Sequence, residues 1–314
     1  MDADLSPPQS PFDARPAPAS PPPVADKPSS VAESSSTKPP PPPASSEGPT
    51  AAKPLPVEWP LTSFSSTPHN VAAIAFVLGA TWSVGAVLLA LNASSWFAWS
   101  SAALQNHVQQ LPQGVWYAAT HSSQLGFYLA CWSFFHLAEF VVTSMYNPGK
   151  LSVSSYLLDN GQLYHVAHVA GILEHVLEDA YLPAEYRRWK HAGGLFLVGV
   201  ALIAAGQWLR SYAMISASSN FSHLLAYSKR PGHRLVKEGI YGWSRHPSYA
   251  GFYWWAFGTQ VMLGNPICGL LFLCMLQWFF HKRIRVEEVY LVKFFGKEYE
   301  DYRREVPSRI LFVP

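Results

Sequence analysis

Two apolar runs joined by a short turn fill residues 247–282, which read PSYAGFYWWAFGTQVMLGNPICGLLFLCMLQWFFHK. Pro247 suits the first turn of a helix, where its missing N–H would have no partner in any case. Gly264-Asn265-Pro266 is typical of a tight turn at a helix boundary. A bilayer crossing takes roughly 20 residues, so each run is short for a span, and taken alone it could equally be a buried helix of a soluble protein. The pattern predicts a helical hairpin over 247–282 that reaches the far leaflet of a membrane without a polar loop.

Outward from this hairpin, the chain contains further apolar segments that are candidates for membrane-spanning helices. Together with the two runs of the hairpin, the candidates are 71–91, 123–145, 163–176, 192–210, 249–263 and 266–280. Charged residues make up only 13% of the chain, about half the share of an average globular protein. We therefore predict an all-α fold, a multi-pass integral membrane helical bundle of about six spans.

Residues 1–56 have a different composition from the rest of the chain. They are rich in Pro, Ser and Ala and include an uninterrupted run of prolines at 39–43. Such a segment cannot bury enough apolar surface to offset the entropy lost on ordering. We predict a disordered arm over 1–56, transmembrane helices over 57–219, and a C-terminal region over 220–314 that contains the hairpin and most of the polar motifs.

Lysine and arginine are distributed unevenly among the loops. Residues 92–122 contain neither, whereas 226–246 contain Lys229, Arg230, Arg234, Lys237 and Arg245. Positive loops face the cytosol, so an even number of spans places both chain ends and the C-terminal region on the cytosolic side. Arg187, Arg188 and Lys190 conflict with this arrangement, because they fall on the predicted lumenal side. The net charge of +2 gives no indication of a nucleic-acid partner.

Polar and aromatic residues gather where the fifth apolar segment begins, in the sequence Gly242-Trp243-Ser244-Arg245-His246-Pro247-Ser248-Tyr249. If Pro247 starts a helix, Arg245 and His246 lie at its N-terminus, which favours an anion such as the carboxylate of S-adenosylmethionine. Tyr241 and Tyr249 could supply an aromatic wall and hydroxyl groups for an adenosine or a sulfonium cation. The alternative interpretation is that the Arg-His pair only anchors the helix at the membrane boundary.

A second polar group, Arg283, Glu287 and Glu288, follows the sixth apolar segment. If the helix continues out of the membrane, Arg283 and Glu287 are four residues apart and share a face. One interpretation is an exposed ion pair worth about 0.2–0.5 kcal/mol. The other is that Arg283 holds a substrate carboxylate through two hydrogen bonds, while Glu287 binds a polar group of a cofactor. The spacing alone leaves both open.

These residues resemble the isoprenylcysteine carboxyl methyltransferase family, whose members methylate the C-terminal prenylcysteine of processed CaaX proteins. The resemblance covers about 135–311. It rests on the sequences FHLAE at 135–139, NFSH at 220–223, RHPSYAG at 245–251 and GTQVML at 258–263. The RHPxYxG element occurs in other membrane methyltransferases as well, whereas the hairpin sequence joined to it is more specific.

The resemblance implies that 220–314 is the catalytic region and that S-adenosyl-L-methionine is the methyl donor. It assigns the substrate carboxylate to Arg283. Where some members have a cofactor-contacting Gln, this chain has Ala226, so no side-chain contact is expected there. Cofactor contacts are assigned to His233, Arg234, Leu235, Val236, Tyr241, His246, Pro247, Ser248, Tyr249 and Glu287.

The partners implied by the resemblance are the C-termini of prenylated CaaX proteins and membrane lipid, in the endoplasmic reticulum membrane with the site facing the cytosol. A prenylcysteine carboxylate is ionised at neutral pH, since an α-carboxyl group has a pKa of about 3.5, so no general base is required. We expect a lipid-facing gap between spans through which the prenyl group enters. We expect no metal site: His165, His168 and His175 should pair with other polar groups inside the bundle, as should His136 and Glu139.

Two other functions stay open. A phospholipid N-methyltransferase shares the RHPxYxG element, but its nucleophile is an amine, so Arg283 would have no carboxylate to hold. A non-catalytic receptor or scaffold on a sterol-reductase-like membrane core would use the charged pairs structurally. In that case the Pro-rich arm could recruit SH3-like or WW-like partners.

Overall fold

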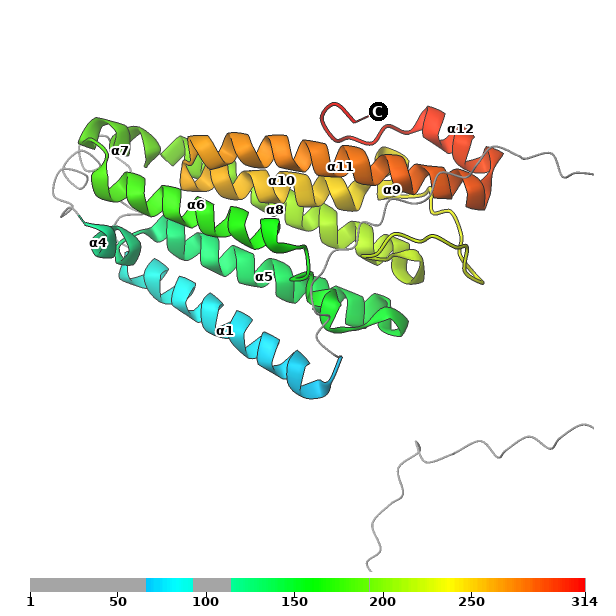
Figure 1. Ribbon diagram of the computed structural model, residues 1–314, viewed down its shortest axis with the longest axis horizontal. Coiled ribbons are helices and arrows are strands. Elements are labelled where there is room, and N and C mark those ends of the chain that lie inside the picture. The colour runs from blue at the N-terminus through cyan, green and yellow to red at the C-terminus, as the bar shows by residue number, and fades with distance from the viewer. Residues whose placement is uncertain (1–65, 93–113, 192, 314) are drawn as a thin grey trace, which may run out of the picture. The chain divides into compact units, whose positions relative to one another are not determined.

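The computed structural model describes residues 66–92, 114–191 and 193–313, and the predicted arm 1–56 lies outside them. Throughout these residues the regular secondary structure is helical. The long helices lie side by side in Figure 1 and comprise α1 (Pro68–Leu91), α5 (Ser123–Tyr146), α6 (Gln162–Tyr181), α8 (Gly193–Ala217), α10 (Pro247–Leu263) and α11 (Pro266–Phe295). The predicted all-α fold is confirmed for the described part of the chain.

Each of the six predicted apolar segments is a helix. The helices α1, α5 and α11 and the helical stretch Ala184–Asn220, which contains α8, are long and apolar enough to cross a membrane. The remaining two, α6 and α10, have 20 and 17 residues, so their crossing stays a prediction. Helix α11 has 30 residues, or about 45 Å at 1.5 Å per residue. It is therefore longer than a hydrocarbon core of about 30 Å. The helix continues through Arg283 and Glu287, as predicted, whereas the position of this part outside the membrane stays a prediction.

The predicted hairpin is formed by α10 and α11. Gly264 ends α10 in the left-handed conformation, with φ of 70°, which glycine adopts without strain. The start of α11 is capped by Glu174 of α6, whose carboxylate accepts the backbone N–H groups of Ile267 at 2.8 Å and Cys268 at 2.7 Å. A helix start inside a bilayer needs such partners, because lipid offers none.

Glycines bring α8 and α10 into backbone contact. A Cβ atom at Gly206 would lie 2.4 Å from the backbone nitrogen of Trp255, and one at Gly251 would lie 2.5 Å from that of Arg210. Small residues allow this close approach of helices in a membrane, where packing rather than the hydrophobic effect drives association. The contact fixes α10, which carries the RHPSYAG motif, against α8.

Replacing Gly206 by alanine is expected to destabilise the bundle by about 1–3 kcal/mol, because the added methyl group must displace the backbone of Trp255. The matched control is Gly79→Ala in α1, where an added Cβ meets no heavy atom within 4 Å. Thermal unfolding of both variants in the same detergent measures the difference. Equal unfolding temperatures for the two variants would show that the α8–α10 contact tolerates a side chain.

The positive residues that conflicted with the predicted topology are largely buried in the protein. Lys190, at the end of α7 (Ala184–Lys190), is fully buried, and its Nζ lies 3.0 Å from Glu178 Oε2 and 3.2 Å from Asp179 Oδ1. Arg187 is only 4% exposed. Charges that are neutralised inside the bundle say little about which side of the membrane the loop faces. Lys190 therefore says little about the orientation, whereas Arg188, which is 34% exposed, still conflicts with the predicted topology. The orientation itself stays a prediction.

The histidines of α6 do not converge on one point. His168 pairs with Tyr128 at 2.6 Å and His175 with Ser122 at 2.7 Å, whereas His165 bonds a loop carbonyl at 2.9 Å. In the part of the chain that the structure describes, no group of three or more His, Cys, Asp and Glu side chains is arranged to hold a metal ion. Each histidine has a polar partner, as expected for intramembrane polar residues.

Candidate functional site

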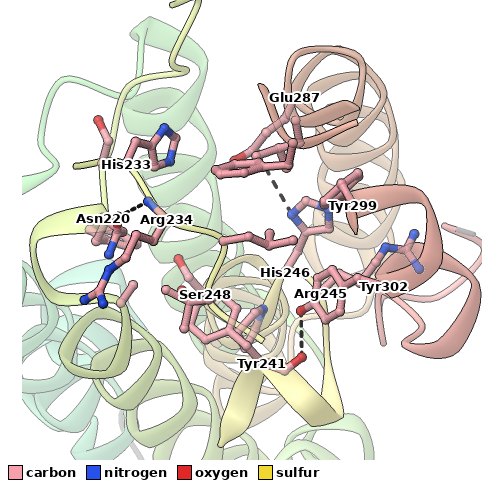
Figure 2. Close-up of a pocket in the computed structure, with 18 of the residues that line it drawn as sticks. Asn220, His233, Arg234, Tyr241, Arg245, His246, Ser248, Glu287, Tyr299 and Tyr302 are labelled. Carbon is pink, nitrogen blue, oxygen red and sulfur yellow. Dashed lines mark hydrogen bonds and ion pairs between the residues drawn. The ribbon is translucent and has the colours of Figure 1, made fainter. Parts of the chain in front are cut away.

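A cavity lies where α10 begins and the outer part of α11 passes α9 (Ile240–Trp243) and α12 (Lys297–Glu305) (Figure 2). All ten residues to which cofactor contacts were assigned line this cavity: His233, Arg234, Leu235, Val236, Tyr241, His246, Pro247, Ser248, Tyr249 and Glu287. They come from a loop and three different helices. The fold therefore brings the predicted site residues together, while their individual roles stay predictions.

Several residues without a predicted role also line the cavity, among them Asn220, Phe295, Tyr299 and Tyr302. The two tyrosines are three residues apart on α12, and both are buried. Their spacing on an otherwise charged helix marks the one face of α12 that packs inward. This pattern could have identified α12 as a wall of the site.

Asn220 fixes the loop 233–236 that forms one wall. Its Oδ1 accepts a hydrogen bond from the backbone N–H of Arg234 at 2.9 Å, as Figure 2 shows. The next residue, Phe221, is held in turn, because Lys150 donates from Nζ to its carbonyl oxygen. The NFSH element therefore links the segment that follows α5 to the loop 233–236.

His233 presents an uncharged ring to the cavity. Partial burial, together with the positive charges of Arg230, Lys150 and Lys229, lowers the pKa of His233, so its imidazole is neutral near pH 7. Its Nδ1 is buried without a hydrogen-bond partner among the described residues. The ring meets that of Phe295 edge to face, with centroids 5.2 Å apart. This arrangement suits a flat, polar heterocycle.

The opposite wall is aromatic and acidic. The rings of His246 and Tyr249 are nearly parallel, 4° apart, with centroids separated by 5.6 Å. Tyr249 donates from its hydroxyl to Glu287 Oε2 at 2.7 Å, and His246 Nε2 lies 3.2 Å from Glu288 Oε1. Aromatic faces and carboxylates both attract a cation, so this wall favours positive charge on a bound molecule.

Tyr241 closes the floor of the cavity. Burial raises the pKa of Tyr241, which keeps its hydroxyl protonated. That hydroxyl donates to the carbonyl oxygen of Ala213 in α8 at 3.2 Å, while the Tyr241 carbonyl accepts a hydrogen bond from Tyr302 at 2.6 Å. The residue thus links α8 to α12, and its assigned cofactor contact would involve the ring rather than a free hydroxyl.

Arg283 lies beside the cavity, one helical turn before Glu287 in α11. Its Nε donates to the hydroxyl oxygen of Tyr249 at 2.9 Å and its Nη2 donates to the carbonyl oxygen of His223 at 2.5 Å. Within the described residues, Arg283 is linked to Glu287 through the Tyr249 hydroxyl and not by a direct ion pair. A guanidinium has five N–H donors, so donors remain for a carboxylate ligand.

Arg245, at the helix start where the sequence favoured a bound anion, pairs its side chain with a carboxylate of the protein itself. Its Nη2 lies 2.9 Å from Glu288 Oε1, and its Nη1 donates to the carbonyl oxygen of Val306 at 2.5 Å. Arg303 of α12 adds a second positive charge 3.6 Å from Glu288. Arg245 therefore ties the start of α10 to α11 and to the segment after α12. Sequence spacing could not show this, because Val306 is distant along the chain.

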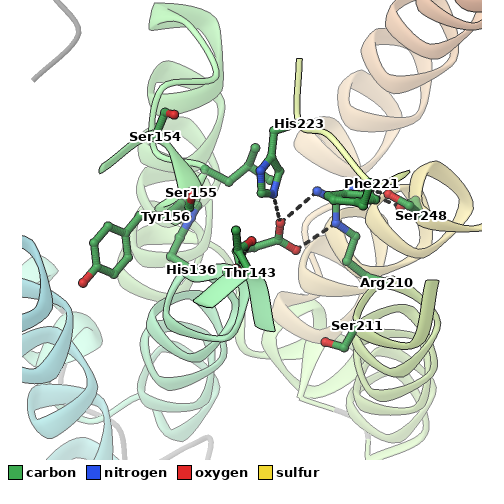
Figure 3. A network of polar contacts seen from close by, with 12 residues as sticks. His136, Thr143, Ser154, Ser155, Tyr156, Arg210, Ser211, Phe221, His223 and Ser248 are labelled. Atoms are coloured by element: carbon green, nitrogen blue, oxygen red, sulfur yellow. Dashed lines mark hydrogen bonds and ion pairs between the residues drawn. The ribbon is translucent and has the colours of Figure 1, made fainter. Parts of the chain in front are cut away.

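A buried charge network lies behind the cavity (Figure 3). Glu139 of α5 accepts two hydrogen bonds from Arg210 of α8, at 2.8 and 2.9 Å, and its Oε2 lies 2.8 Å from His223 Nε2. Arg210 also donates from Nη1 to the hydroxyl of Ser248 at 2.6 Å. Glu139 is 1% exposed and Arg210 4%. Glu139 thus pairs with other polar groups inside the bundle, as predicted, and its ion pair joins three helices and the NFSH element. The partner, Arg210, was not predicted.

A second, apolar cleft lies between α6, α10 and α11. Its lining comprises Asn160, Leu163, Tyr164, Ala167, His168, Phe252, Ala256, Phe272, Met275, Leu276, Trp278 and Phe279. The exposure of Leu163, Met275 and Trp278 shows that the cleft reaches the apolar outer surface. At its inner end, the Phe279 ring lies 5.9 Å from Arg283 Cζ. The cleft therefore opens at the apolar outer surface and adjoins Arg283 through Phe279.

Known proteins of one family resemble this chain in sequence. Residues 198–293 match the model of the isoprenylcysteine carboxyl methyltransferase (ICMT) family. A protein-S-isoprenylcysteine O-methyltransferase of Mus musculus is 36% identical over 245 residues, covering 78% of this chain and 76% of that protein. One of Saccharomyces cerevisiae is 44% identical over 183 residues, covering 58% of this chain and 77% of that protein.

A solved structure shares the fold as well. It is described as the eukaryotic intramembrane Ras methyltransferase ICMT, and it superposes with a TM-score of 0.58 at 32% sequence identity, covering 68% of this chain and 75% of that one. Identity above 30% over three quarters of the mouse relative, together with the shared fold, settles the relationship. This chain belongs to the isoprenylcysteine carboxyl methyltransferase family.

Proposed function

We propose that this chain is a protein-S-isoprenylcysteine O-methyltransferase that uses S-adenosyl-L-methionine to esterify the C-terminal prenylcysteine carboxylate of processed CaaX proteins. The observation that carries the proposal is the position of Arg283. It lies between a polar cavity and an apolar cleft. A prenylcysteine likewise has a polar end, its carboxylate, and an apolar end, its hydrocarbon chain.

The cavity residues fit S-adenosylmethionine, which supplies a sulfonium methyl group when bound. The cavity itself has a volume of about 130 Å³, below the range of about 300–1,000 Å³ for small-molecule sites, but it adjoins an open depression of about 710 Å³ that shares the wall 233–236. His233, with its neutral ring and unpartnered Nδ1, suits the adenine. Glu287 suits a polar group of the cofactor, and the parallel rings of His246 and Tyr249 suit its cationic centre.

The protein's own residues act by orientation. Methyl transfer forms a bond from a carboxylate oxygen to the methyl carbon and breaks the bond between that carbon and sulfur. No proton moves, because the carboxylate is already ionised, so no general base is needed. Arg283, fixed by the Tyr249 hydroxyl, holds the carboxylate in line with the methyl group. The surrounding helices exclude water while opposite charges neutralise each other.

The apolar cleft provides a route for the prenyl chain, which can remain in contact with lipid while its carboxylate reaches Arg283. We also infer six spans in the endoplasmic reticulum membrane, with both chain ends and the cavity on the cytosolic side. The positive residues of 226–246, next to the cavity, support this orientation. The catalytic region is 220–314, supported from behind by Glu139 and Arg210.

Purified full-length protein, labelled S-adenosylmethionine and two alternative acceptors test the function. N-Acetyl farnesylcysteine should gain a base-labile methyl ester, whereas phosphatidylethanolamine should gain no methyl group. Methylation of phosphatidylethanolamine instead would favour the phospholipid N-methyltransferase, and transfer to neither would favour the scaffold. Unprenylated N-acetylcysteine is the control for the cleft: equal activity on it would contradict the role of the apolar lining.

Replacing Asn220 by alanine is expected to raise the Kd for S-adenosylmethionine about 2- to 10-fold. One hydrogen bond, worth about 0.5–1.5 kcal/mol, would no longer hold the loop 233–236. The matched control is Asn220→Asp, which keeps an oxygen acceptor for the Arg234 N–H and should bind nearly as well as the unmodified protein. Titration calorimetry compares the three proteins. If both variants weaken binding equally, the acceptor oxygen is not what matters.

A further inference from the structure

The segment that follows α12, residues 307–313, forms a hook that runs back along α11 (Figure 1). Its side chains divide into two sets. Ile310 and Val313 turn inward and are 4% and 7% exposed, whereas Leu311 and Phe312 turn outward and are 44% and 89% exposed. Leu311 and Phe312 thus form a small apolar tip that no other described residue covers.

The backbone of the hook holds this tip outward. Arg309 and Phe312 have φ values of 61° and 54°, in the left-handed region that bulky residues avoid unless their surroundings impose it. Two such residues within four positions reverse the chain tightly. The reversal places Phe312 on the outside, where it meets no core.

The hook lies at the depth of the spanning helices. Ile310 and Val313 pack in a cluster with Tyr253 of α10 and Phe280 of α11. Tyr253 comes six residues after the first residue of α10, Pro247, which is about 9 Å along the helix. The hook therefore extends past the start of α10 in the direction of the membrane rather than away from it.

Several polar groups of the hook pair within the hook or with its base. Ser308 donates from its hydroxyl to the Val313 carbonyl, and the Val313 N–H donates to the Ile310 carbonyl at 3.1 Å. The Ser308 carbonyl accepts a hydrogen bond from the Ser244 hydroxyl at 2.6 Å. These hydrogen bonds fix the shape of the hook and join it to Ser244 at the start of α10.

The base of the hook has the side chains that are typical of a membrane interface. Trp243 is 44% exposed. The Arg309 guanidinium lies 5.4 Å from the centre of its ring, and Arg309 Nε donates to the Trp243 carbonyl at 3.2 Å. Tryptophan collects at the headgroup level, and arginine extends its charge towards water from the same position.

We propose that the hook is a membrane-interface anchor. Leu311 and Phe312 insert among the acyl chains of the leaflet at the cavity end of the bundle, with Trp243 and Arg309 at the headgroups. The anchor is coupled to the site, because the Arg245 N–H donates to the Pro307 carbonyl at 3.1 Å. The anchored hook therefore holds the neighbouring helix α12 in place. Tyr299 and Tyr302 of the cavity wall, which belong to α12, are held with it.

Depth-dependent fluorescence quenching tests the anchor. An environment-sensitive fluorescent amino acid replaces Phe312 in the full-length protein, which is reconstituted into phosphatidylcholine nanodiscs. The control carries the same label at Arg304 of α12, whose side chain is 70% exposed. Nitroxides near the headgroup end of the acyl chains should quench most of the emission at 312 and little at 304. Aqueous iodide should do the reverse, and emission at 312 should be shifted to the blue.

Two results would overturn the proposal. Iodide that quenches both positions equally would place the tip in water, and protection of 312 from both quenchers would place it against protein. A label at Leu311 repeats the measurement at a second site, so a local disturbance at 312 cannot decide the outcome. None of these measurements involves methyl transfer, so they test the anchor separately from the proposed enzyme activity.

Discussion

Replacing Arg283 by alanine is expected to lower kcat/KM for N-acetyl farnesylcysteine by about 10²- to 10⁴-fold. The guanidinium can give a carboxylate two charge-assisted hydrogen bonds, each worth about 1.5–3 kcal/mol. Their loss removes the group that holds the nucleophile in line. Steady-state kinetics with labelled S-adenosylmethionine measures the effect, and calorimetry measures cofactor binding in parallel. The Kd for the cofactor should change little, since Arg283 lies beside the cavity lining and not within it.

Two companion variants define what Arg283 does. Arg283→Lys keeps the charge but cannot form two parallel hydrogen bonds, so its kcat/KM should lie between those of the unmodified protein and the alanine variant. Tyr249→Phe removes the hydroxyl that accepts from Arg283 Nε and donates to Glu287, and it should lower kcat while leaving the fold intact. An alanine variant that loses cofactor binding as completely as activity would show that the carboxylate role is wrong.

The hairpin of α10 and α11 was predictable from sequence because its determinants are local. Apolar length, Pro247 and the Gly264 turn act within a few residues, and each recurs in the structure as expected. The convergence of the ten assigned residues on one cavity had a different source. Composition and spacing favoured a bound anion near His246, but the assignment of His233 depended on the family resemblance.

The partners of charged residues were not predictable in the same way. Lys190 and Arg187 read as a lumenal positive loop, because sequence does not show that Lys190 reaches Glu178 and Asp179 of a neighbouring helix. Arg210 lies at the end of a predicted apolar segment, and no role was predicted for it. In the structure it forms the ion pair with Glu139 behind the site. Such pairs depend on how helices pack, and many packings are compatible with one apolar pattern.

Breaking the Glu139–Arg210 ion pair is expected to have a large effect on stability. Replacing Arg210 by alanine is expected to destabilise the protein by about 3–5 kcal/mol, because Glu139 would be left as an uncompensated buried charge. Thermal unfolding in detergent should show a large drop in Tm. The loss is not only global: Arg210 also holds Ser248 in the first turn of α10, and Glu139 holds His223, whose carbonyl oxygen accepts from Arg283.

The double variant Glu139→Leu with Arg210→Met separates stability from positioning. Apolar replacement of both partners of a buried ion pair is often neutral or stabilising, so Tm should recover most of what Arg210→Ala lost. Catalysis should not recover with it, because neither Ser248 nor His223 regains its partner. We expect kcat for N-acetyl farnesylcysteine to stay low in a protein that unfolds normally. Recovery of both would mean that the pair only stabilises the bundle; recovery of Tm alone would make Glu139 and Arg210 positioning residues that set the geometry of α10 and Arg283.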